Sequence, residues 1–186
     1  MVSLYRLLFL FSIFITHVAA DDEGGQFGKA ATSQNGNFQP EDGITENLLF
    51  IPPAGWRNAD NTSLPKHVHL MVVGKGSRDF PPSLALASEP YQGSVKDYLK
   101  VVKKLSVSKG NQWKNLGSIR TEAGNASLSQ TDSQSQWGEI KMMHVILKKD
   151  NTMYILTAAA LKEEFPTFYK EIFAALRSVR FSQKPN

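Results

Sequence analysis

The stretch SIRTEAGNASLSQTDSQSQWGEIKMMHVILKKDNTMYILTA, residues 118–158, decides the fold. It contains four strand-like runs in series, at Ser118–Thr121, Ala126–Thr131, Glu139–Leu147 and Thr152–Ala158. The links between the runs are Gly124 with Asn125, the polar residues 132–136, and Asp150 with Asn151. These are turn residues at hairpin lengths, so we expect consecutive strands to pair antiparallel.

An amphipathic helix is predicted on each side of this stretch. The first, Ser94–Leu105, starts with a serine that can cap the free backbone N–H groups, and Asp97 follows three residues later. Its apolar face consists of Val95, Tyr98, Leu99, Val102 and Leu105. The second, Phe165–Val179, has Pro166 in its first turn and an apolar stripe of Phe168, Ile172, Leu176 and Val179. Two helices packed on an antiparallel β-sheet define an α+β sandwich.

Shorter strands are expected before the first helix, at Leu48–Ile51, His67–Val73 and Ser83–Ser88. Alternation along the second of these places Val68, Leu70 and Val72 on one face. We therefore expect a single folded domain over residues 44–182, followed by a short tail, residues 183–186.

The first 20 residues have the pattern of a signal peptide: one positive charge, an apolar run from Leu7 to Ile15, and small residues before a cleavage site after Ala20. An uncleaved anchor is the alternative, but a membrane span needs about 20 apolar residues. Residues 21–43 are rich in Gly, Asn, Gln and Ser, which predicts a flexible acidic and polar linker. We therefore expect a periplasmic or secreted protein.

Composition excludes several classes of function. The chain has no cysteine, so disulfides, thiol catalysis and thiolate metal sites are excluded. Residues 51–186 hold 19 Lys and Arg against 11 Asp and Glu, whereas residues 21–50 hold one lysine against six acids. A basic domain favours anionic membranes, nucleic acids or acidic proteins. We expect no nucleic-acid partner because the chain is exported and has no nucleic-acid-binding motif.

The histidines are weak candidates for chemistry. His67 and His69 lie two residues apart on a predicted strand, as two metal ligands would, but the sequence identifies no third ligand. His144 has no diagnostic nucleophile or acid beside it, so we interpret it as a core or groove-lining residue. Glu163 and Glu164 suit the start of a helix. We therefore expect no catalytic residue, no bound metal and no cofactor.

Binding residues are the more promising candidates. Trp56, Trp113 and Trp137 each lie beside a loop, where they anchor strand ends or, in the functional alternative, line a concave surface. The first helix carries four lysines off its apolar face that could contact an anionic surface: Lys96, Lys100, Lys103 and Lys104.

Two further motifs are weaker. Gly74 and Gly76 only faintly match a phosphate loop. Asn61 and Asn125 fit the glycosylation acceptor pattern, which matters only in a eukaryote.

The order of features resembles the PsbP-like or Mog-type α/β/α sandwich, whose exported bacterial members are similar to DcrB. The resemblance rests on Phe50-Ile51-Pro52 with Gly55-Trp56, the four serial strands, and a last helix closing with Leu176-Arg177-Ser178-Val179-Arg180-Phe181. It implies a non-enzymatic binding or assembly module whose partner is another protein or an envelope component. The alternatives are a carrier of a small apolar ligand between sheet and helix, or an exported hydrolase.

Overall fold

The computed structural model describes residues 48–60, 64–76 and 78–182. The expected signal peptide (1–20), the linker (21–43), the tail (183–186) and the acceptor site at Asn61 lie outside these residues. None of the helices described is both long enough and apolar enough to span a membrane.

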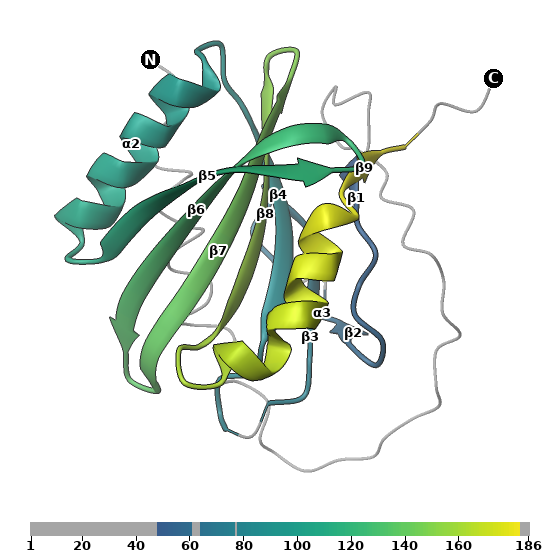
Figure 1. Cartoon of the computed structure of the whole chain (residues 1–186), viewed down its shortest axis with the longest axis vertical. Helices are drawn as coiled ribbons and strands as arrows, with labels where there is room; N and C mark the ends of the chain where they lie inside the picture. Colours follow the sequence, from purple (N-terminus) through teal and green to yellow (C-terminus); the bar gives the residue numbers. More distant parts are fainter. Residues whose placement is uncertain (1–47, 61–63, 77, 183–186) are drawn as a thin grey trace.

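A seven-stranded, fully antiparallel sheet forms the body of the molecule (Figure 1). Its strands lie in the order β2-β3-β4-β8-β7-β6-β5. They are β2 (Arg57–Asn58), β3 (Val68–Val73), β4 (Ser83–Pro90), β5 (Gln112–Thr121), β6 (Gly124–Ser135), β7 (Gly138–Lys149) and β8 (Thr152–Leu161). Strands β5 to β8 are sequential neighbours, which confirms the predicted antiparallel hairpins. The prediction that Gly124 and Asn125 form a link is wrong, because both residues are paired with β5 and begin β6.

Most of the strands are longer than predicted, and two of them, β5 and β6, extend through polar segments that are also paired. Residues 132–135, expected in a link, continue β6 and pair with β7 as far as Ser135 opposite Gly138. The turn is tight because Ser135 Oγ donates to the Gly138 carbonyl (2.8 Å) and accepts from the Trp137 N–H (3.1 Å). Strand β5 starts at Gln112 rather than Ser118. It is an edge strand, so Gln112, Lys114 and Asn115 are exposed, while Trp113 and Leu116 are half-buried.

Helix α2 (Val95–Ser108) begins where its sequence predicts. Ser94 is the N-cap, and its hydroxyl accepts a hydrogen bond from the Asp97 N–H at 3.1 Å. A cap of this kind stabilises a helix by about 1 kcal/mol. Helix α3 (Phe165–Arg177) has Pro166 in its first turn and ends two residues before Val179, which lies fully buried beyond the helix.

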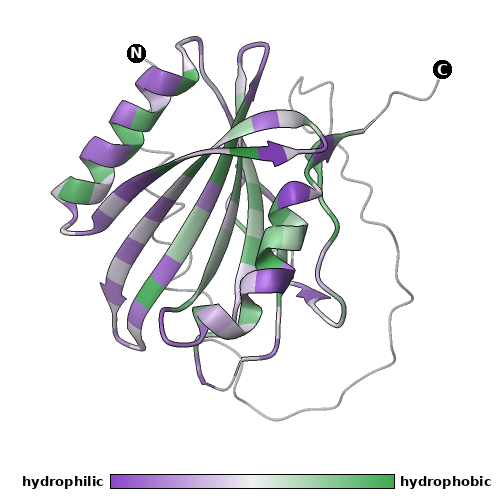
Figure 2. Ribbon diagram, in the orientation of Figure 1, coloured by the Kyte–Doolittle hydropathy of each residue, from purple (hydrophilic) through white to green (hydrophobic). Residues whose placement is uncertain are grey.

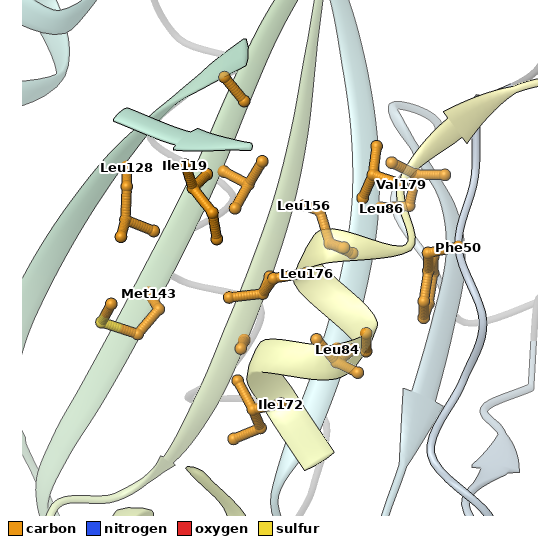
Figure 3. Packing of buried hydrophobic residues seen from close by; sticks show 14 of the residues in the cluster. Phe50, Leu84, Leu86, Ile119, Leu128, Met143, Leu156, Ile172, Leu176 and Val179 are labelled. Carbon is orange, nitrogen blue, oxygen red and sulfur yellow. The ribbon is translucent and has the colours of Figure 1, made fainter. Parts of the chain in front are cut away.

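The two helices cover opposite faces of the sheet, so the domain has two cores. Alternate residues of each strand enter one core or the other: on β7, Met143 and Val145 face α3, whereas Met142 and Ile146 face α2. Figure 3 shows Ile172 and Leu176 of α3 pointing into the core between α3 and the sheet, the α3 core, beside Leu84 and Leu156. Figure 2 shows hydrophilic and hydrophobic residues alternating along α2, as a helix with one buried face requires.

A β-bulge in β3 overturns one prediction. Val68 pairs with Ala87 while Leu70 pairs with Leu86, so the register shifts between them. The shift turns Val68 into the α2 core, whereas Leu70 and Val72 lie in the α3 core. The expected sharing of one face by all three side chains is therefore wrong, because strict alternation fails across a bulge.

The first strand pairs with the end of the chain. Strand β1 (Leu48–Leu49) and β9 (Arg180–Phe181) form a separate two-stranded antiparallel sheet, with Leu48 opposite Phe181. The Ile51 N–H also donates to Ser178 Oγ at 2.7 Å. These bonds fix both ends of the described domain beside the C-terminal end of α3.

Candidate functional site

The outer face of α2 carries the lysines singled out from the sequence. Lys96, Lys100, Lys103 and Lys104 are all exposed, and they lie on the side of the helix away from the sheet. Three of them line a shallow open depression together with Val107 and Ser108. Val107, which is 56% exposed, places an apolar side chain among these lysines. We call Lys96, Lys100, Lys103, Lys104 and Val107 the α2 face.

One acid moderates the positive charge of this face. Lys100 Nζ lies 2.9 Å from Asp97 Oδ1. Hydrogen bonds from Ser94 and then Lys100 lower the pKa of Asp97, and the hydrogen bond to Asp97 raises the pKa of Lys100. Both side chains are exposed, so this pair contributes little to stability. Four lysines against one aspartate leave the α2 face net positive.

Polar contacts on its inner side hold the start of α2 to the sheet. The hydroxyl of Tyr98 donates to the Glu89 carboxylate, and the Tyr98 ring packs edge-on against Tyr91 with centroids 5.0 Å apart. Burial, and then the charge of Glu89, raises the pKa of Tyr98, so its hydroxyl keeps its proton. Lys148 Nζ donates to the Gly93 carbonyl at 2.8 Å. These contacts anchor the first turns of α2 to the sheet.

His144 lies in the core beneath this helix, as expected. Its two ring nitrogens hydrogen bond with Thr157 Oγ1 (3.0 Å) and Thr131 Oγ1 (3.2 Å), and the side chain is 6% exposed. Burial lowers its pKa to about 4, so the ring is neutral at pH 7. A catalytic histidine would need an orienting carboxylate and access to substrate. The described residues give His144 two threonine hydroxyls and a closed environment instead.

The other two histidines lie at the bulged end of β3. His69 Nε2 hydrogen bonds with Ser88 Oγ on β4, and the Ser88 N–H donates to the carbonyl of His67. Burial, and secondly the neighbouring His67, lowers the pKa of His69 to about 4. No group of three or more His, Asp or Glu side chains in the described part of the chain is arranged to hold a metal ion.

The tryptophans do not share one surface. Trp56 packs with the α3 core, edge-on to Phe168 at a centroid distance of 6.4 Å. Trp113 and Trp137 pack with the α2 core, and the ring centroids of Trp137 and Phe80 are 5.6 Å apart. Their half-buried rings close the ends of the two cores.

Gly74 of the glycine motif and Glu163 of the acidic pair both make structural contacts. A Cβ on Gly74 would lie 2.7 Å from the Trp56 ring, so Gly74 is needed for close packing, not for a phosphate. Glu163 forms an exposed ion pair with Arg78 at 2.6 Å. Asn125 is exposed near the turn between β5 and β6.

A second surface feature was missed in the sequence. An open groove runs between β5–β6 and the C-terminal half of α3, lined by Ser118, Ile119, Arg120, Leu128, Phe173 and Arg177. These residues are about 50 positions apart in the chain, so only the fold brings them together. Arg177 lies in the closing segment Leu176–Phe181, on which the family resemblance rests. No residue near it in the sequence indicates that it meets Arg120. Met142 and Met143 are buried in opposite cores and line neither this groove nor the α2 depression.

Solved structures of low sequence identity share this architecture. LpqN of Mycobacterium tuberculosis, described as involved in cell envelope biogenesis, matches with a TM-score of 0.55 at 14% identity, over 76% of this chain and 87% of that one. Cyanobacterial PsbP from Synechocystis matches with a TM-score of 0.52 at 14% identity, over 86% of this chain and all of that one. The Ran-binding protein Mog1p of Saccharomyces cerevisiae matches with a TM-score of 0.50 at 12% identity, over 74% and 94%. No protein-family model and no curated protein matches the chain in sequence.

The antiparallel sheet, covered by one helix on each face, defines an α+β sandwich. Within that class the chain has the PsbP- and Mog1-like fold. At these identities the similarity shows the fold alone, and none of the three descriptions names a chemical reaction.

Proposed function

We propose that the protein is an exported, non-catalytic binding module whose α2 face contacts an anionic membrane surface of the cell envelope. The observation that carries the proposal is the α2 face itself, where four exposed lysines and an exposed valine project from one helix. Lysine ammonium groups beside an anionic bilayer contribute about 1 kcal/mol each at low ionic strength. An apolar side chain among them can enter the interface between headgroups and acyl chains.

Two further observations support this function. The leader of residues 1–20 predicts export, which would place the folded domain where membrane surfaces are present. Among proteins with this fold, LpqN is described as involved in cell envelope biogenesis. The closed environment of His144 supports a role without catalysis.

Co-sedimentation with anionic vesicles tests the proposal. The parent should bind vesicles containing anionic lipid at low salt, and binding should fall steeply as salt rises, because the Debye length is only about 10 Å at 0.1 M. Replacing Lys96, Lys100, Lys103 and Lys104 by glutamine should abolish binding. Neutral vesicles should bind neither protein.

A matched control separates the α2 face from overall charge. Arg57, Lys66, Lys75 and Lys170 are exposed and lie off α2, so their replacement by glutamine removes the same charge elsewhere. This control should bind like the parent. Equal loss of binding in both variants, or no binding by the parent, would reject the α2 face as the docking surface.

A further inference from the structure

The groove beside α3 is a second surface, independent of the α2 face. Its floor is apolar, formed by Ile119 of β5 and Leu128 of β6, both almost completely buried. One wall is the α3 side chain Phe173, whose ring packs against Tyr169 at a centroid distance of 4.3 Å. Tyr169 is itself 49% exposed, so an aromatic surface continues along the helix from the groove.

A bulge gives the other wall its shape. The register between β5 and β6 shifts between Asn115 and Gly117, immediately before the three β5 residues that line the groove. Gly117 has φ +92°, which favours glycine, and its N–H donates to Asn115 Oδ1 at 2.9 Å. Figure 1 shows β5 crossing toward the C-terminal end of α3. Bulges that turn a strand in this way are common next to functional sites.

One end of the groove is closed by backbone hydrogen bonds. The N–H of Glu122, which follows β5, donates to the carbonyl of Arg177 at 3.0 Å, and the Ala123 N–H donates to the carbonyl of Val179 at 2.7 Å. The side chains of Arg120 and Arg177 line the groove near this end. Both are exposed, and their spacing is held by the bonds that join β5–β6 to α3.

These two arginines are uncompensated within the described residues. Glu122, two residues after Arg120, pairs with Arg180 at 3.6 Å. No ion pair of Arg120 or Arg177 occurs in residues 48–60, 64–76 and 78–182. A basic side chain in the last turn suits the negative end of a helix, which accounts for Arg177. It does not account for Arg120, which approaches from the sheet.

The combined chemistry selects a particular occupant. Guanidinium groups bind carboxylates through paired, charge-assisted hydrogen bonds, and the floor between the walls accepts an apolar side chain. Strand β5 pairs only with β6 in the described sheet, so its outer edge can hydrogen bond with an extended backbone. We infer that the groove binds an acidic segment of a protein partner, with an apolar side chain on Ile119 and Leu128 and carboxylates at Arg120 and Arg177.

The test uses the full mature chain and two capped synthetic peptides. One peptide has a leucine between pairs of aspartate and glutamate, and the other has asparagine and glutamine in their place. In amide NMR spectra, the acidic peptide should shift the signals of Ser118–Arg120 and Phe173–Arg177 and leave those of α2 unchanged. The amide peptide should bind at least about tenfold more weakly, because it cannot form charge-assisted hydrogen bonds.

Variants locate the interaction. Arg120→Gln with Arg177→Gln should weaken binding about tenfold or more. Arg57→Gln, an exposed arginine on the opposite edge strand, should change it less than about twofold. Both arginines of the groove are exposed, so the double variant is expected to fold, and an unchanged thermal midpoint verifies that.

Several results would overturn the inference. These are equal binding of the two peptides, equal loss in the Arg57 control, shifts on α2 instead of the groove, or no shift at millimolar peptide. If anionic vesicles shift the groove signals, the site binds lipid instead. If the groove signals move when residues 21–43 are removed and no peptide is added, the groove binds the chain's own acidic segment instead. None of these readouts depends on the α2 lysines. Peptide binding in the groove and membrane binding by the α2 face can therefore each fail while the other stands.

Discussion

Burial of neutral His144 makes the stability of the protein depend on pH. Its pKa falls from 6.5 to about 4 in the folded protein, through burial alone. Between these two values the unfolded chain binds a proton that the folded protein does not, so the free energy of unfolding decreases as the pH falls. Each pKa unit corresponds to 1.36 kcal/mol, so acidification from pH 7 to pH 4 should cost about 3 kcal/mol at this side chain. A typical domain is stable by only about 5–15 kcal/mol.

The variant His144→Gln isolates this contribution. Glutamine can hydrogen bond with both Thr131 and Thr157 but does not titrate. The free energy of unfolding of both proteins would be measured in urea at several pH values from 4 to 7. The stability advantage of the parent over the variant should shrink by about 3 kcal/mol across this range. His69, which also has a lowered pKa, is present in both proteins and cancels in the difference.

Two results would refute the reasoning. The first is a pair of stability curves that run parallel between pH 4 and pH 7. The second is an NMR titration in which the His144 ring protonates near pH 6.5 in the folded protein. Either result would mean that the imidazolium ion is solvated or paired, contrary to the closed threonine environment.

Three further predictions concern packing and capping, with urea unfolding as the measurement. Gly74→Ala should destabilise the domain by about 1–3 kcal/mol, because the new methyl group meets the Trp56 ring at 2.7 Å; a neutral result would show that the ring moves freely. Leu176→Ala should lower the free energy of unfolding by about 2–5 kcal/mol, because Leu176 is fully buried. Val107→Ala, at an exposed position, should change it by no more than about 0.5 kcal/mol, and similar values for the two variants would contradict the core assignment. Ser94→Ala should cost about 1 kcal/mol through loss of the α2 cap, unless a solvent molecule replaces the hydroxyl equally well.

The sequence predicts this fold where its signals are local. Ser94 and the apolar spacing after it place α2, and the turn residues between strands fix the hairpins, because caps and turns depend on a few neighbouring side chains. The sequence does not predict the polar end of β6 as strand, because its pairing depends on distant partners. Asp132 is only 8% exposed, and its Oδ2 lies 3.3 Å from Lys162 Nζ. The bulge that redirects Val68 has no distinctive residue to announce it.

The two candidate surfaces also differ in how far the sequence predicts them. The lysines of α2 could be found because helical periodicity separates them from the apolar positions. The groove depends on Arg120 and Arg177, which meet only because β5 bends over the end of α3. Nothing in a single sequence couples these two arginines, because they lie far apart in the chain and share no motif.

The small sheet of β1 and β9 gives the domain a polarity. The chain enters at Leu48 and leaves after Phe181, and these residues lie opposite each other in an antiparallel pair. Anything joined to either end therefore emerges from one pole of the molecule, and Figure 1 shows α2 on the other side of the sheet's long strands. A load that pulls the two ends apart would be borne first by the two residue pairs that join β1 and β9, whereas α2 and its lysines lie away from that pair.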